Sequence, residues 1–143
     1  MPQATGVYVW LVLMKAHQAL LKRAERSIEE TGMCFTDFRI LEILLHKGPL
    51  PVNTVGARTG LTSGSATTAI DRLVTRDLVE RVDDPADRRA RIVHLTPAGE
   101  KLIEKVFAKH AKAMEKAASG LSPRERGELT DLLKRLGTNA KGE

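Results

Sequence analysis

The stretch of sequence that decides the fold is LTSGSATTAIDRLVTR, residues 61–76. Thr62 or Ser63 can cap a helix at its start, because a side-chain hydroxyl accepts a backbone N–H that the first turn leaves unpaired. Apolar side chains then recur at three- and four-residue spacing and share one inward face; they are Ala66, Ile70, Leu73 and Val74. The opposite face is small and polar with one long cation, and it carries Ser65, Thr68, Arg72 and Thr75. This pattern predicts an amphipathic helix whose outer face is lined with hydroxyl groups.

The segments on either side of this helix predict a compound motif. Residues 52–58 are a short helical candidate, and Thr59-Gly60-Leu61 connects them tightly to the next helix. A turn of three or four residues that contains Gly, between two short helices, is typical of a helix-turn-helix. Downstream, LVERV (78–82) and ARIVHL (90–95) alternate in polarity around the loop DDPADRR (83–89). Such a pattern predicts a β-hairpin with a basic tip, and a helix-turn-helix followed by a hairpin is the order of a winged helix.

The run from residue 60 to residue 99 resembles the multiple-antibiotic-resistance regulator (MarR) family of bacterial transcription factors. The matching pieces are GLTSGSATTAIDRL (60–73), RDLVER (76–81) and DPADRRARIVHLTPAG (84–99). HKGP (46–49), SGS (63–65) and FAKH (107–110) are most similar to a branch that regulates catechol and quinone resistance. The resemblance implies a mainly α fold with a small β-wing, that is, a winged helix-turn-helix with N- and C-terminal helices forming a dimerisation region. The whole chain, residues 1–143, is then a single domain of this kind.

Long helices are predicted on both sides of the winged helix unit, which spans about residues 36–95. The first covers about residues 7–30, although its start, VYVWLVLM, could equally form a strand. That start is apolar almost all round, which predicts burial against a second subunit. About residues 97–137 hold two more helices, the second opened by a capping box at Ser122 and Glu125 and ending near residue 136. The tail after Gly137 is expected to be disordered, and the resemblance implies that the terminal helices intertwine in a homodimer.

A DNA-reading role is predicted for the hydroxyl-lined helix and for the hairpin tip. Alone, either feature would be only a solvated surface, but their combination indicates contact with double-stranded DNA. Hydroxyls can bond bases or phosphates, Arg72 can reach a phosphate or a guanine, and an arginine at a wing tip suits the minor groove. The resemblance places Arg89 as the inserted cation and Asp87 as the residue that orients the wing. Arg91 can instead contact the DNA backbone. The predicted DNA-binding residues are Thr62, Ser63, Ser65, Thr68, Arg72, Arg88, Arg89 and Arg91.

Two hypotheses concern the control of DNA binding. In the family, phenolic ligands bind where the terminal helices meet the DNA-binding unit, so the resemblance implies a pocket for a small phenolic or quinone-like effector. The candidate lining residues are Trp10, Met14, His17, Cys34 and Phe38. The second hypothesis is a redox role for Cys34, since some members of the family sense peroxides or quinones through a cysteine. Their reactive cysteine lies within the first helix, whereas Cys34 follows it, and the alternative is a small structural residue.

Composition limits the remaining possibilities. Net charge is +5, yet residues 52–91 carry seven Arg and Lys against six Asp and Glu, so the case for DNA depends on where the arginines lie. A single cysteine fits the reducing cytoplasm, and the apolar run 7–14 is shorter than the about twenty residues of a membrane span. Metal-ligand spacings and catalytic motifs are lacking, so we expect no cofactor, no metal and no enzyme.

The predicted function is that of a sequence-specific transcription regulator. More finely, the sequence and the resemblance predict a ligand- or redox-responsive homodimeric repressor that binds a palindromic operator. The alternatives are a weakly specific architectural DNA-binding protein without ligand control and a protein-interaction module built on a winged helix.

Overall fold

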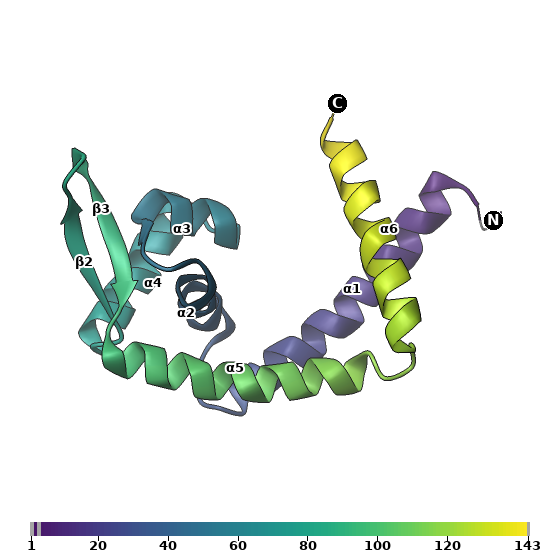
Figure 1. The fold of residues 1–143 in the computed structure, drawn as a ribbon, viewed down its shortest axis with the longest axis horizontal. Helices are drawn as coiled ribbons and strands as arrows, with labels where there is room; N and C mark the ends of the chain where they lie inside the picture. The colour runs from purple at the N-terminus through teal and green to yellow at the C-terminus, as the bar shows by residue number, and fades with distance from the viewer. Residues whose placement is uncertain (1, 3, 143) are drawn as a thin grey trace. The chain divides into compact units, whose positions relative to one another are not determined.

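The computed structural model describes residue 2 and residues 4–142, with the side chain of Arg88 left out. The elements are α1 (Gly6–Glu29), α2 (Phe35–Lys47), β1 (Leu50–Pro51), α3 (Val52–Thr59), α4 (Ser63–Thr75), β2 (Val79–Asp84), β3 (Asp87–Leu95), α5 (Pro97–Ala117) and α6 (Pro123–Lys141) (Figure 1). By contact the chain forms two compact units, which we call the terminal unit (residues up to 23 and from 112 onward) and the central unit (residues 24–111). Helices α1 and α5 each contribute residues to both units. None of the described helices is long and apolar enough to cross a membrane.

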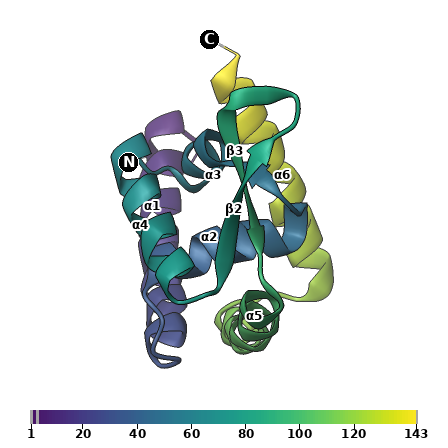
Figure 2. The ribbon, with the colours of Figure 1, turned by 90° about the vertical axis from the view of Figure 1, so that its left-hand side faces the viewer.

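A three-stranded antiparallel sheet, in the order β1-β3-β2, closes one side of the central unit. Strands β2 and β3 form a hairpin paired from Val79–Leu95 to Asp84–Asp87, around a turn at Pro85 and Ala86 (Figure 2). The predicted loop over residues 83–89 is therefore too long, because the strands remain paired almost to the tip. Sequence analysis also missed β1, whose two residues follow Gly48-Pro49 and pair with β3 at its edge. Proline is tolerated at such an edge because it has no N–H to donate to the ladder.

The core of the central unit gathers the inward faces of its helices and the sheet. Its largest fully buried side chains include Phe38, Ile70 and Leu73. The inward face of α4 differs from the prediction at two positions, since Val74 is 37% exposed while Ala69 is buried. Ala69 lies three residues beyond Ala66 and four before Leu73, so it completes the stripe, and Val74 falls at the edge of that stripe.

The start of α5 is fastened to the turn between α4 and β2. Thr96 Oγ1 donates to the backbone oxygen of Asp77 (2.7 Å) and accepts from the backbone N–H of Gly99 (3.0 Å). Thr96 thus caps the start of α5. Gly99 lies directly against the backbone of Leu78, and a Cβ added there would lie only 2.8 Å from the Leu78 carbonyl carbon and closer still to its oxygen. The LTPAG run at residues 95–99 therefore has a packing function, since it holds the wing and α4 to α5.

The terminal unit contains most of α1, the end of α5 and all of α6. The N-terminal segment is helical from Gly6 onward, which settles the helix-or-strand alternative. The capping box of α6 is confirmed: Ser122 Oγ accepts from Glu125 N–H (3.2 Å) and Glu125 Oε1 accepts from Ser122 N–H (2.9 Å). The hydrogen bond from the Ser122 backbone N–H to the Glu125 carboxylate lowers the pKa of that carboxyl group. The prediction of a disordered tail after Gly137 is wrong, because α6 continues to Lys141; one glycine costs a helix only about 1 kcal/mol.

Candidate nucleic-acid interface

The outer face of α4 carries the hydroxyl groups that the sequence indicates. Thr62 is the N-cap, and its Oγ1 accepts from the backbone N–H of Ser65 at 3.1 Å. Ser63, Ser65 and Thr68 are all exposed, while Ala66 and Ala69 between them are buried. The hydroxyl of Thr62 is therefore occupied in starting the helix, and those of the other three residues are presented on its surface.

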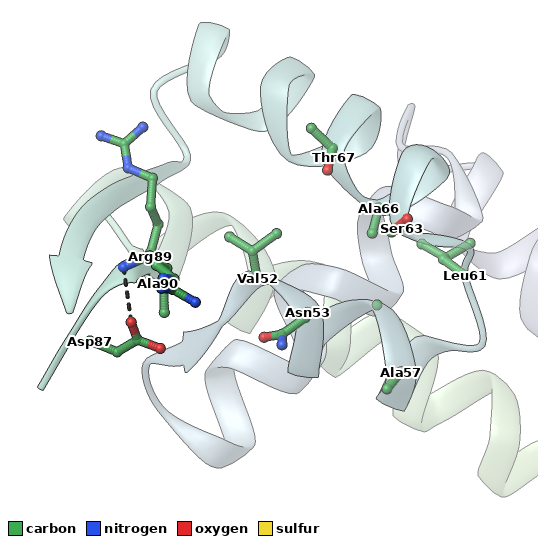
Figure 3. Close-up of a pocket in the computed structure, with 12 residues that line it drawn as sticks. Val52, Asn53, Ala57, Leu61, Ser63, Ala66, Thr67, Asp87, Arg89 and Ala90 are labelled. Carbon is green, nitrogen blue, oxygen red and sulfur yellow. Dashed lines mark hydrogen bonds between the residues drawn. The ribbon is translucent and has the colours of Figure 1, made fainter.

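A groove of about 550 Å³ lies between α3, the start of α4 and the wing. Figure 3 shows Asp87 and Arg89 of the wing on one side of it, with Asn53 of α3 and Ser63 and Thr67 of α4 among the residues facing them. Sequence analysis did not single out Asn53 or Thr67. Thr67 could have been found as the hydroxyl on the flank of α4 next to Thr68, whereas Asn53 had only its polarity within a short helix as a signal.

The tip of the wing is shaped by its own carboxylates. Asp87 Oδ1 accepts from the backbone N–H of Arg89 at 2.9 Å (Figure 3). Asp84 Oδ1 accepts from Ala86 N–H at 2.9 Å. Asp87 thus fixes the backbone at Arg89 and leaves its guanidinium free of that bond. The Arg89 side chain is exposed and extends away from Asn53 (Figure 3).

The other wing arginines differ from Arg89. Arg91 Nε lies 3.5 Å from Asp83 Oδ1, an ion pair across the hairpin between two exposed side chains. The side chain of Arg88 lies outside the described residues, so its predicted role stays a prediction. Of Arg89 and Arg91, Arg89 is therefore the one whose guanidinium is more available to contact DNA.

Arg72, predicted to reach DNA from α4, is paired within the central unit. Its Nη2 donates to Asp37 Oδ1 of α2 at 2.8 Å, and the hydrogen bond and the charge of Asp37 raise the pKa of Arg72. The Asp37 side chain is only 5% exposed, and Arg76 Nη1 lies 3.9 Å from its other oxygen. Sequence reasoning missed this carboxylate because Asp37 is far from α4 along the chain, and helical spacing relates only near neighbours.

A second ion pair joins the wing to α4. Arg81 of β2 donates through Nη2 to Asp71 Oδ1, and the same nitrogen lies 3.5 Å from the backbone oxygen of Thr67. The adjacent residues Asp71 and Arg72 therefore pair in different directions, one with the wing and the other with α2. These contacts hold α4 between its two neighbours.

The five candidate effector residues are divided between the two units. Trp10, Met14 and His17 are exposed on α1 in the terminal unit, where His17 lines an apolar groove of about 500 Å³ together with Tyr8 of α1 and Leu129 and Leu133 of α6. Within the central unit, Cys34 is exposed at the N-cap of α2.

Phe38, the last of the five, is buried in the core of the central unit. Its ring centroid lies 5.0 Å from that of His110 and 6.3 Å from that of Phe35. In the described part of the chain, no three His, Cys, Asp or Glu side chains gather in a way that could hold a metal ion.

A helix-turn-helix with an exposed hydroxyl face, followed by an arginine-tipped hairpin, defines a DNA-binding protein of the winged helix class. Comparison with known proteins makes the assignment specific. A sequence model of the MarR family matches residues 31–90. The HTH-type transcriptional regulator MhqR of Bacillus subtilis is 35% identical over 133 residues, which cover 93% of this chain and 92% of MhqR. The chain belongs to the MarR family, and it is a transcription regulator that binds DNA.

Solved structures agree with this assignment. The structure of Bordetella bronchiseptica BpsR, described with the regulation of its DNA binding by 6-hydroxynicotinic acid, is 28% identical with a TM-score of 0.78, covering 90% of this chain and 98% of BpsR. A mutant of Escherichia coli MarR in complex with operator DNA has a TM-score of 0.78 at 20% identity, covering 90% of this chain and 92% of that one. The second likeness shows a shared fold. The named relatives are regulators, in agreement with the expectation that the chain is not an enzyme.

Proposed function

We propose that this protein is a homodimeric repressor that binds a palindromic operator and is released by a small phenolic or quinone-like compound. The observation that carries the proposal is the apolar surface of the terminal unit. Large apolar side chains of α1 and α6 are exposed there, including Trp10 at 58% and Leu132 at 57%. Proteins that act as single chains rarely leave so much apolar surface on neighbouring elements, and a second copy of the same chain would cover it.

A two-fold dimer explains how a unit with a single reading helix recognises a defined site. Two-fold symmetry places two reading helices about 34 Å apart, one turn of B-DNA, so that each enters the major groove of one half of a palindrome. In this arrangement Ser63, Ser65 and Thr68 meet base edges or phosphates, and the helix capped by Thr62 starts at the groove. Arg89 enters the flanking minor groove, while Arg88 and Arg91 contact the DNA backbone. The helices over about residues 7–30 and 97–137 form the dimer interface, and the unit over about residues 36–95 binds DNA. The protein acts in the cytoplasm.

The effector part of the proposal is supported by a relative. The DNA binding of BpsR is regulated by 6-hydroxynicotinic acid, a small hydroxylated aromatic compound, which supports an effector of similar chemistry here. The exposed candidate contacts are Trp10, Met14 and His17 in the terminal unit and Cys34 in the central unit, whereas Phe38 is buried in the core of the central unit. A ligand that binds better to a state with altered spacing of the reading helices would release the operator, since only differential affinity shifts such an equilibrium.

The dimer is tested by placing a charge on its proposed interface. Leu132→Asp is expected to raise the dissociation constant of the dimer at least about 30-fold, because a carboxylate is then desolvated in an apolar contact. Sedimentation equilibrium measures the dissociation constant of the dimer. Fluorescence anisotropy measures the dissociation constant of the complex with an operator, which is first selected from a pool of random duplexes. Lys134→Asp is the control, since this residue lies on the opposite side of α6 and should leave both constants near wild type. If Leu132→Asp and wild type have the same dimer dissociation constant, the proposed interface is wrong.

The effector is tested on the same complex. Phenols and quinones added to the protein–operator complex are expected to lower the affinity for the operator at least about tenfold. The affinity for random duplex should change less. Cys34→Ser separates the two modes of control, because it abolishes a response through the thiol, whereas the serine can still contact a reversibly bound ligand. A wild-type affinity for operator less than about tenfold above that for random duplex would instead favour the architectural alternative.

A further inference from the structure

The charges of α4 are almost all engaged within the protein. Arg72 donates to Asp37, Arg76 at the C-cap lies 3.9 Å from the same carboxylate, and Asp71 pairs with Arg81. The remaining exposed side chains of the helix are mostly hydroxyl-bearing, at Ser63, Ser65, Thr67, Thr68 and Thr75. A helix proposed to enter the major groove thus presents neutral hydrogen-bonding groups there, and its two cations point toward α2.

Asp37 is the centre of this arrangement. Its side chain is 5% exposed in the first turn of α2, and both of its oxygens face cations from α4. A carboxylate with so little solvent needs close compensation, and the 2.8 Å bond from Arg72 supplies it. Arg72 itself remains 48% exposed, so the pairing with Asp37 is what directs its guanidinium inward.

We propose that Asp37 determines specificity: by holding Arg72 and Arg76 against α2, it keeps both cations away from the DNA backbone. The inference rests on the proposed placement of α4 in the major groove. An arginine free on a reading helix attracts phosphates of any sequence, and each added phosphate contact strengthens non-specific binding and steepens its dependence on salt. With both cations held, hydroxyl contacts to base edges contribute a larger share of the affinity, and random DNA is bound weakly.

The experiment compares Asp37→Asn with wild type on random duplex and on the selected operator over a range of salt concentrations. Asparagine has nearly the same shape but no charge, so Arg72 and Arg76 are released. We expect affinity for random duplex to rise at least about fivefold at low salt, with a slope of log K against log salt steeper by about 0.9 to 1.8. The ratio of operator affinity to random-duplex affinity should fall accordingly. Asp131→Asn makes the same change in net charge at an exposed position on α6 and should leave the slope unchanged.

Three further variants test the route through the arginines. Asp37→Glu keeps the carboxylate and should retain the wild-type slope, whereas a merely structural role would be disturbed by the longer side chain. The double variant Arg72→Gln/Arg76→Gln should show the same salt slope on random duplex as the wild type. The same two changes combined with Asp37→Asn should cancel the increase in slope that Asp37→Asn causes. The double arginine variant also keeps the test decisive if Asp37→Asn does not fold. If its salt slope is lower than that of the wild type by about 0.9 or more, the arginines already contact phosphates in the wild type, and the proposal is overturned.

Failure of this inference is distinguishable from failure of the proposed function. If the wild type prefers its operator but folded Asp37→Asn binds random duplex no more tightly, the role of Asp37 is overturned and operator recognition stands. If the wild type does not distinguish operator from random duplex, the proposed function fails and the inference fails with it.

Discussion

Arg89→Ala is expected to weaken binding to the operator by at least about tenfold, and up to about 100-fold, with the dimer still folded. Arg89 is exposed at the wing, and the Asp87 carboxylate holds its backbone through a 2.9 Å bond to the N–H group. In the proposed complex the guanidinium enters the narrow minor groove, where the negative potential is deepest. Because a dimer has two wings, each operator complex loses two such contacts.

Fluorescence anisotropy with the selected operator measures this effect, and sedimentation equilibrium checks the dimer. Arg124→Ala is the matched control: it removes an arginine that is exposed on α6 and paired with Glu128 four residues later, so operator affinity should stay within about twofold of wild type. Operator affinity in Arg89→Ala equal to that of the control would show that this cation has no part in recognition.

Gly99→Ala should cost at least about 3 kcal/mol in the free energy of unfolding, enough to leave much of the protein unfolded at 37 °C. The added Cβ would lie 2.8 Å from the carbonyl carbon of Leu78 and closer to its oxygen, and both atoms belong to backbone. Backbone cannot turn aside as a flexible side chain can. The clash would therefore separate α5 from the α4–β2 turn, where Thr96 donates to Asp77.

Urea denaturation followed by circular dichroism measures the loss, with Gly127→Ala as the control. Gly127 lies inside α6 with nothing within 4 Å of an added Cβ, and it faces away from the leucines of that helix. Alanine there should raise the free energy of unfolding by up to about 1 kcal/mol through helix propensity. If both alanine variants unfold at the wild-type urea concentration or above, the packing role of Gly99 is wrong.

Local patterns predicted the elements well where a chemical signal marked their ends. The hydroxyl of Thr62 and the capping box of Ser122 and Glu125 mark helix starts, and both helices begin there. The predictions failed where the signal was weak or misleading. Gly137 predicted the end of α6, but the helix continues to Lys141. Strand β1 has only two residues and is too short to show an alternating pattern.

Contacts between elements were less predictable. The outer face of α4 follows from helical geometry, so exposure of Ser65 and Thr68 could be expected from spacing alone. The inward turn of Arg72 could not, because its partner Asp37 lies on another helix and nothing in the spacing relates the two. The same holds for Arg81, whose partner Asp71 belongs to a different element. Ion pairs of this kind are set by tertiary packing.

The claim that two reading helices act together is tested most directly by changing the distance between half-sites. On the selected palindrome, we expect two chains per duplex, and insertion of about five base pairs at its centre should turn one half-site to the far side of the helix. Anisotropy titration should then show affinity lower by at least about 100-fold, while insertion of a full turn of about ten base pairs should lower it less. Equal affinity for all three duplexes, or one chain per duplex, would contradict the account.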